Sequence, residues 1–295
     1  MPMMRSSSFE SVITQLDSAI GWVASHDVRS RPSRYATYLE TIQRIEKRWR
    51  EGATRADEIS VDPVLMETAF REGIQLIRIA TAFRGRHVEG MLPKLKRLID
   101  GPVLEGDERS SNSGHVGRDT GFELEVAAYF SSAGYVEFPP DIDLVLHAGG
   151  ISYYFECKRP SSPQKLRPNL NRARTQLIHR LSQTRMTSYG VVALSASKVH
   201  WSPGALLTVT SVASLRDSVT VWLARFDREH ITTWLHAQPD NRLAAVLVHL
   251  PYTAYVGDSP PISTSEFFLL GRHGRGSQLA KDLRRLTVIA NTAVR

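Results

Sequence analysis

Cysteine is almost absent from this chain of 295 residues, because Cys157 is the single one. One cysteine excludes an internal disulfide framework and is typical of a reducing compartment. No apolar run approaches the roughly 20 residues that a membrane-spanning helix requires. Residues 1–8 also lack an adjoining apolar core of the kind found in signal peptides. We therefore expect a cytoplasmic protein without a membrane partner.

Several familiar catalytic motifs are missing as well. The ten histidines include no His-x-x-x-His pair with a partnering acid and have no cysteine companion, which argues against a zinc site. No Gly-x-Ser-x-Gly elbow supports a serine hydrolase. The stretch Gly271–Gly276 is glycine-rich and basic but lacks the Lys-Ser pair of a nucleotide-binding loop, so it is predicted to be a surface loop.

Acidic residues are missing from a long internal stretch. From Cys157 to Arg216 there is no Asp or Glu, and the whole chain carries 37 Lys and Arg against 30 Asp and Glu, a net charge of +7. Such a one-signed block favours a phosphate-facing surface, with DNA as the expected partner and RNA left open. A solvated helix face is the alternative for any single arginine. The residues expected to bind nucleic acid are Arg159, Lys165, Arg167, Arg172, Arg174 and Arg180.

Two kinds of hydrophobic pattern divide the chain. Residues 9–99 show helical spacing throughout, whereas helix and strand patterns alternate after a polar stretch. We predict a helical domain (1–100), a linker (101–117) and an α/β domain (118–295). The helical domain would serve in recognition, in regulation, or in oligomerisation as a homodimer or with a partner protein. The helical pattern breaks near 30–32, Gly52 and 84–86. The α/β domain is predicted to contain helices over 119–133, 171–181, 211–235 and 277–286 and strands over 189–194 and 243–250.

A hairpin over residues 141–158 is the most informative local feature. Gly149 and Gly150 separate two β-rich runs, and a two-residue glycine loop supplies the positive φ angles of a tight turn. This register places Asp143 opposite Glu156 and Asp141 opposite Lys158, all on one face. Opposed carboxylates repel unless a cation lies between them, and Mg²⁺ prefers oxygen ligands from one or two carboxylates. Lys158 could then orient the attacking water or neutralise charge on the transition state.

These residues resemble the core of the PD-(D/E)XK nuclease superfamily over about residues 115–200. Glu156-Cys157-Lys158 is the only Glu-x-Lys or Asp-x-Lys in the chain, and Gly121-Phe-Glu123 resembles the family's helix opening, which favours Glu123 over Glu125. The resemblance implies a restriction-endonuclease-like fold, an α/β (α+β) arrangement with a mixed sheet flanked by helices. It also implies a Mg²⁺ cofactor, with Mn²⁺ as a substitute. The implied catalytic residues are Asp143, Glu156, Lys158 and Glu123, and the implied metal ligands are Asp143, Glu156, Glu123 and the Cys157 carbonyl.

Simpler explanations stay open for several of these residues. The hairpin charges could be surface pairs worth about 0–1 kcal/mol each. Glu123 could close a capping box with Thr120. Asp141 competes with Asp143 as the principal acid, because Pro140-Asp141 spells the dipeptide of the family name. Gln176 is an auxiliary candidate, since the family often carries a polar residue on the following helix.

The expectation that follows is a Mg²⁺-dependent deoxyribonuclease that hydrolyses phosphodiester bonds. Restriction or antiviral defence is preferred among the roles that the fold serves, although fold alone does not select among them. The alternatives are a nuclease-like module that binds nucleic acid or a partner without cleavage, and a nuclease that acts on RNA.

Overall fold

The computed structural model describes residues 9–28, 33–52, 61–110, 115–184, 187–200, 207–256 and 262–271, together with 281–283, 286 and 288. The described part of the N-terminal segment is mainly helical, as expected. Its helices are α1 (Phe9–Ala24), α2 (Arg34–Arg50), α3 (Pro63–Phe83) and α4 (Met91–Leu98). Helix α2 ends just before Gly52, whose φ is +100°, and α3 ends just before Arg84. The expected break at 30–32 falls outside the described residues, as do residues 272–276 of the glycine-rich stretch.

The second half is built around one mixed sheet. In the described chain its strands are β1 (Tyr135–Glu137), β2 (Leu144–Ala148), β3 (Ile151–Lys158), β4 (Ser188–Ser195), β5 (Leu207–Val209), β6 (Leu243–Val256) and β7 (Ile262–Gly271). Their order is β1-β2-β3-β4-β6-β5, and β7 lies against β6. The β1–β2, β2–β3 and β6–β7 pairs are antiparallel, and the others are parallel. The mixed α/β class is therefore confirmed.

The remaining helices differ in part from their predicted limits. They are η2 (Glu105–Ser110), α5 (Val116–Phe130), α6 (Pro163–Ser182), α7 (Ser197–His200), α8 (Val212–Phe226), η3 (Asp227–Ile231) and α9 (Thr232–His236). Helix α5 begins three residues before the expected 119–133. The expected helix over 211–235 contains a π-helical turn at η3. Of the expected helix over 277–286, only 281–283 and 286 are described, and these are helical.

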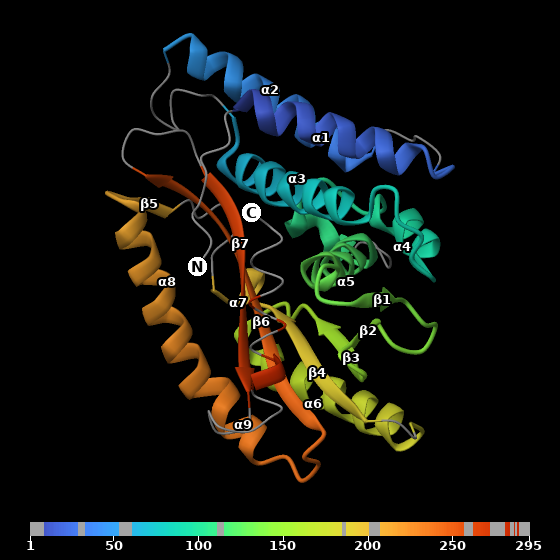
Figure 1. The fold of residues 1–295 in the computed structure, drawn as a ribbon. Coiled ribbons are helices and arrows are strands. Elements are labelled where there is room, and N and C mark those ends of the chain that lie inside the picture. Colours follow the sequence, from blue (N-terminus) through green and yellow to red (C-terminus); the bar gives the residue numbers. More distant parts are fainter. Residues whose placement is uncertain are drawn as a thin grey trace.

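Alternating strand residues divide between two hydrophobic cores. On β4, Val191 and Ala193 join the core with helices α1 to α5, whereas Val192 and Leu194 join the core with α6, α8 and α9. The period of two follows from the strand geometry, which turns successive side chains to opposite faces. In Figure 1, α1 to α5 gather at one side of the strands, and α8 and α9 lie at the other. The sheet is therefore covered on both faces.

The N-terminal helices share their core with the sheet. Leu16, Ile42 and Leu76 belong to the same buried cluster as Phe122 of α5 and Phe155 of β3. Helix α3 packs against α5, β6 and β7, and α4 packs against α5. The residues expected to form a linker include η2 and the start of α5. The described N-terminal helices are thus part of the packing that positions the sheet.

Gly90 lets α4 approach the sheet closely, and its replacement should be costly. A Cβ at Gly90 would lie 2.1 Å from the Phe138 carbonyl oxygen, whereas one at Gly85 would meet nothing within 4 Å, although both residues have φ of +74°. Gly85→Ala should cost about 1–2 kcal/mol for the left-handed backbone alone. Gly90→Ala should cost roughly 1–3 kcal/mol more because of the clash. Urea unfolding measures both, and equal losses would contradict the close approach.

Candidate functional site

The hairpin forms at the expected turn and in the expected register. Gly149 and Gly150 have φ of +58° and +76°. Ala148 pairs with Ile151 and Leu144 with Phe155, as predicted. The paired ladder of β2 ends at Leu144, because residues 141–143 form a turn and bend instead of continuing the strand. The predicted register therefore holds along the hairpin up to Leu144 but does not extend to residues 141–143.

Asp143 nevertheless reaches β3 through its side chain. Its Oδ2 accepts a hydrogen bond of 2.7 Å from the backbone N–H of Cys157. The Lys158 ammonium lies 3.9 Å from the same oxygen and donates a hydrogen bond of 2.7 Å to Glu156 Oε2. One ammonium group is thus shared by the two carboxylates that were expected to converge. The Cys157 thiol lies in the buried cluster on the α5 side of the sheet, so this side chain packs as a small apolar residue.

Asp141 does not face Lys158, and that expectation is wrong. Because residues 141–143 leave the ladder, the Asp141 carboxylate turns outward and pairs with Arg180 on α6. Its side chain is 54% exposed, compared with 24% for Asp143. Asp143 is therefore the acid that joins Glu156 and Lys158.

Glu123 lies beside a lysine that the sequence did not point to. Its Oε2 accepts a hydrogen bond from Lys94 of α4, and both side chains are largely buried. The capping-box alternative is wrong, because α5 begins at Val116 and Thr120 is buried inside the helix. Glu125, two residues on, points elsewhere and bonds with Gln75 and Arg78.

The three carboxylates are close enough to perturb one another. Burial raises the pKa of Glu123 and of Glu156 to about 7, and repulsion from the Asp143 carboxylate adds to both shifts. The neighbouring ammonium groups, Lys94 for Glu123 and Lys158 for Glu156, oppose the rise. Burial and the surrounding acids also raise the pKa of the Cys157 thiol. Glu123, Asp143, Glu156, Lys94 and Lys158 are called the acid–lysine cluster below.

The acid–lysine cluster should make the metal-free protein less stable as the pH rises. Each glutamate has an ordinary pKa of 4.5 and a folded pKa of about 7. The folded chain therefore keeps protons that the unfolded chain releases in this interval, so stability falls between these values and levels off above pH 7. Urea unfolding with chelator at pH 5 and pH 8 measures the loss. Asp143→Asn should reduce the loss, because it removes the repulsion, and an unchanged pH dependence would contradict this cause.

The donor chemistry of the acid–lysine cluster fits a hard cation with few protein ligands. Within the described residues, no group of three or more His, Cys, Asp or Glu side chains is placed to hold a metal ion. Magnesium needs less than this, because one or two carboxylates are enough when substrate and water complete its shell. Asp143 and Glu156 offer those carboxylates, and the Cys157 carbonyl directly follows Glu156 in the chain.

The basic residues of α6 are placed in three different ways. Lys165, Arg167 and Arg172 are exposed, as a phosphate-facing surface requires. Arg174 donates a hydrogen bond of 3.1 Å to Gln238, and Arg180 is paired with Asp141. Gln176 is exposed on α6 and, among the described residues, makes no hydrogen bond or ion pair with the acid–lysine cluster.

Arg159 is buried, and the expectation that it lies on the surface is wrong. It pairs with Glu105, with Glu108 at 3.7 Å and with Asp119 at 2.8 Å. Its side chain is 6% exposed. The acids that neutralise it come from η2 and the start of α5. The absence of acidic residues from 157 to 216 therefore does not show which charges surround Arg159 in the fold.

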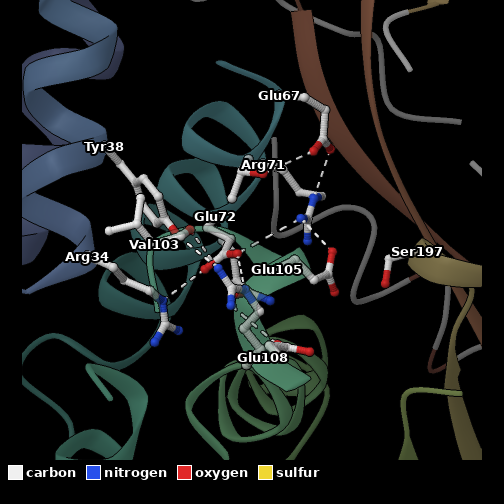
Figure 2. Close-up of polar contacts among 12 residues, drawn as sticks. Arg34, Tyr38, Glu67, Arg71, Glu72, Val103, Glu105, Glu108 and Ser197 are labelled. Carbon is white, nitrogen blue, oxygen red and sulfur yellow. Dashed lines mark hydrogen bonds and ion pairs between the residues drawn. The ribbon is translucent and has the colours of Figure 1, made fainter. Parts of the chain in front are cut away.

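Arg159 belongs to a buried ion network between α2, α3, η2 and α5. Glu72 of α3 pairs with Arg34 at 3.0 Å and with Arg118. Figure 2 shows Arg71 between the carboxylates of Glu67 and Glu105, to which it bonds at 2.8 and 3.0 Å. Although burial opposes the change, the surrounding guanidinium groups lower the pKa of Glu72. The network ties the N-terminal helices to the helix that carries Glu123.

None of the helices that the structure describes combines the length and the apolar character needed to cross a membrane. Searches against protein-family models, curated proteins and solved structures found no match to this chain.

Proposed function

We propose that the chain is a Mg²⁺-dependent endonuclease that hydrolyses DNA phosphodiester bonds with a core of the restriction-endonuclease-like fold. The observation that carries the proposal is the Lys158 ammonium shared by Asp143 and Glu156, at 3.9 and 2.7 Å. Carboxylates and a lysine in this arrangement suit phosphodiester hydrolysis, because they offer oxygen ligands for a hard cation and a donor for phosphate. The hairpin that carries them is the segment in which the sequence resembles PD-(D/E)XK nucleases.

Asp143 and Glu156 would hold the cation, with the Cys157 carbonyl as a further oxygen. Bound magnesium would supply Lewis-acid polarisation of the phosphate oxygens. Asp143 is fixed for this role by the Cys157 N–H, which holds its carboxylate against the end of β3. Glu156 is buried almost completely, so its carboxylate is oriented by packing and by Lys158.

Lys158 would act as a charged donor to the reacting phosphate. It already donates a hydrogen bond to Glu156 and lies beside Asp143. Its ammonium would stabilise negative charge that develops on the phosphate and would orient the attacking water. The exposed residues Lys165, Arg167 and Arg172 of α6 supply positive charge for the nucleic-acid backbone.

The test is cleavage with and without the metal ion. The purified full chain is incubated with supercoiled plasmid, linear DNA and an RNA oligonucleotide, each with Mg²⁺ and with excess chelator. Nicked or linear plasmid is expected with Mg²⁺ alone, and activity should return when Mg²⁺ is added back to the chelated protein. Cleavage that persists in chelator contradicts the proposal. Binding without cleavage under every condition would favour a nucleic-acid-binding module, and cleavage of RNA alone would replace DNA as the substrate.

A further inference from the structure

Lys94 brings a positive charge from the N-terminal helical segment into the proposed site. Its ammonium bonds to Glu123 Oε2, and the two side chains are 15% and 13% exposed. The ammonium also lies 5.7 Å from the centroid of the Phe138 ring, within range of a cation–π contact. Each glutamate of the acid–lysine cluster thus has its own lysine, Lys94 for Glu123 and Lys158 for Glu156.

The backbone that carries Lys94 is fixed against the sheet. The Glu89 carbonyl accepts a hydrogen bond of 2.9 Å from the Phe138 N–H. Gly90 approaches the Phe138 carbonyl so closely that no side chain fits there. Met91, Leu95 and Leu98 anchor the inner face of α4 in the core. These contacts hold Lys94 near Glu123 in the absence of any ligand.

The charges of the acid–lysine cluster match one divalent cation better than two. Three carboxylates and two ammonium groups leave one negative charge when all are ionised. One divalent cation and one phosphodiester, which carries a single negative charge, would then make the site neutral. A second divalent cation would leave it with two uncompensated positive charges in a largely buried place, which is unfavourable.

We propose that Lys94 is an internal counter-ion that takes the place of a second divalent cation beside Glu123, so that the site binds a single metal ion through Asp143 and Glu156. This inference rests on the proposed function. It gives the N-terminal helical segment a role in the site, because α4 supplies one of the two positive charges there. Lys94 is a positioning residue in this scheme, since it acts through Glu123 and not on the reacting atoms.

The test counts bound ions by calorimetric titration of the full chain with Mn²⁺ at pH 8. The wild-type protein should bind one ion per chain. Lys94→Met, which keeps the length of the side chain and removes the charge, should bind two. Lys94→Arg keeps the positive charge and should again bind a single ion. If Lys94 acted only through the packing of its side chain, this return to one ion would not be expected. Two ions in the wild type, or one ion in Lys94→Met, would overturn the inference.

Glu123→Gln gives a second measurement that does not depend on the folding of the lysine variants. It should still bind one Mn²⁺ because Asp143 and Glu156 remain, although more weakly than the wild type because the Lys94 charge is then no longer offset. Loss of Mn²⁺ binding in this variant would show that Glu123 is itself a ligand and would overturn the inference. The failures are distinguishable. A wild type that cleaves DNA and binds two ions refutes the role of Lys94 alone, whereas one that neither cleaves nor binds Mn²⁺ refutes the proposed function as well.

Discussion

Asp143→Asn is expected to reduce Mg²⁺-dependent DNA cleavage on the order of a thousandfold, which corresponds to about 4 kcal/mol of transition-state stabilisation. Asparagine has nearly the same shape, and its amide oxygen can still accept the Cys157 N–H, so the hairpin end should keep its conformation. What is lost is the negative charge that would hold the cation and that lies beside Lys158. The measurement is the single-turnover rate of plasmid cleavage at saturating Mg²⁺.

Asp141→Asn is the matched control, because it makes the same chemical change two residues away. Asp141 is exposed and paired with Arg180, and exposed pairs contribute little. Its cleavage rate should stay within about twofold of the wild type. If Asp141→Asn lost activity and Asp143→Asn kept it, the assignment of the principal acid would be reversed.

The second large effect concerns stability: Glu72→Ala should lower the free energy of unfolding by about 3–5 kcal/mol. Glu72 pairs with Arg34 and Arg118, whose side chains are 0% and 2% exposed. Removing the carboxylate takes from Arg34 and Arg118 the acid that they share, although Glu108 still pairs with Arg118 at 3.3 Å. A buried charge that loses its partner is strongly unfavourable. Urea unfolding at neutral pH measures the loss.

Glu51→Ala provides the surface comparison. Glu51 also contacts two basic residues, Lys47 at 4.0 Å and Arg48 at 3.3 Å, but its side chain is 47% exposed. Its removal should cost less than about 1 kcal/mol. Similar losses for the two variants would mean that the buried ion network contributes no more than an ordinary surface pair.

Local features of the site could be predicted from the sequence because their causes are local. Gly149 and Gly150 determine a tight turn, and a tight turn determines the strand register near it. The prediction failed at the far end of the hairpin. There, register alone could not show that the ladder stops at Leu144 and that Asp141 turns toward α6.

Features that depend on distant segments could not be predicted in this way. Lys94 meets Glu123 across 29 positions of the chain, and the contact depends on how α4 docks against α5. Arg159 looked exposed because no acid follows it for a long stretch, but Glu105 and Glu108 lie before it in a segment expected to be a linker. Residue spacing and composition do not predict the tertiary packing that brings these groups together.

The common core of the N-terminal helices and the sheet has a consequence for how the chain loses its structure. Because Leu16, Ile42 and Phe155 are buried in one cluster, removing residues 1–100 would expose the apolar face of α5 and the sheet to water. A shortened protein beginning at Gly101 should therefore aggregate instead of folding. Heating the intact chain should produce one cooperative transition in which the helical segment and the sheet melt together.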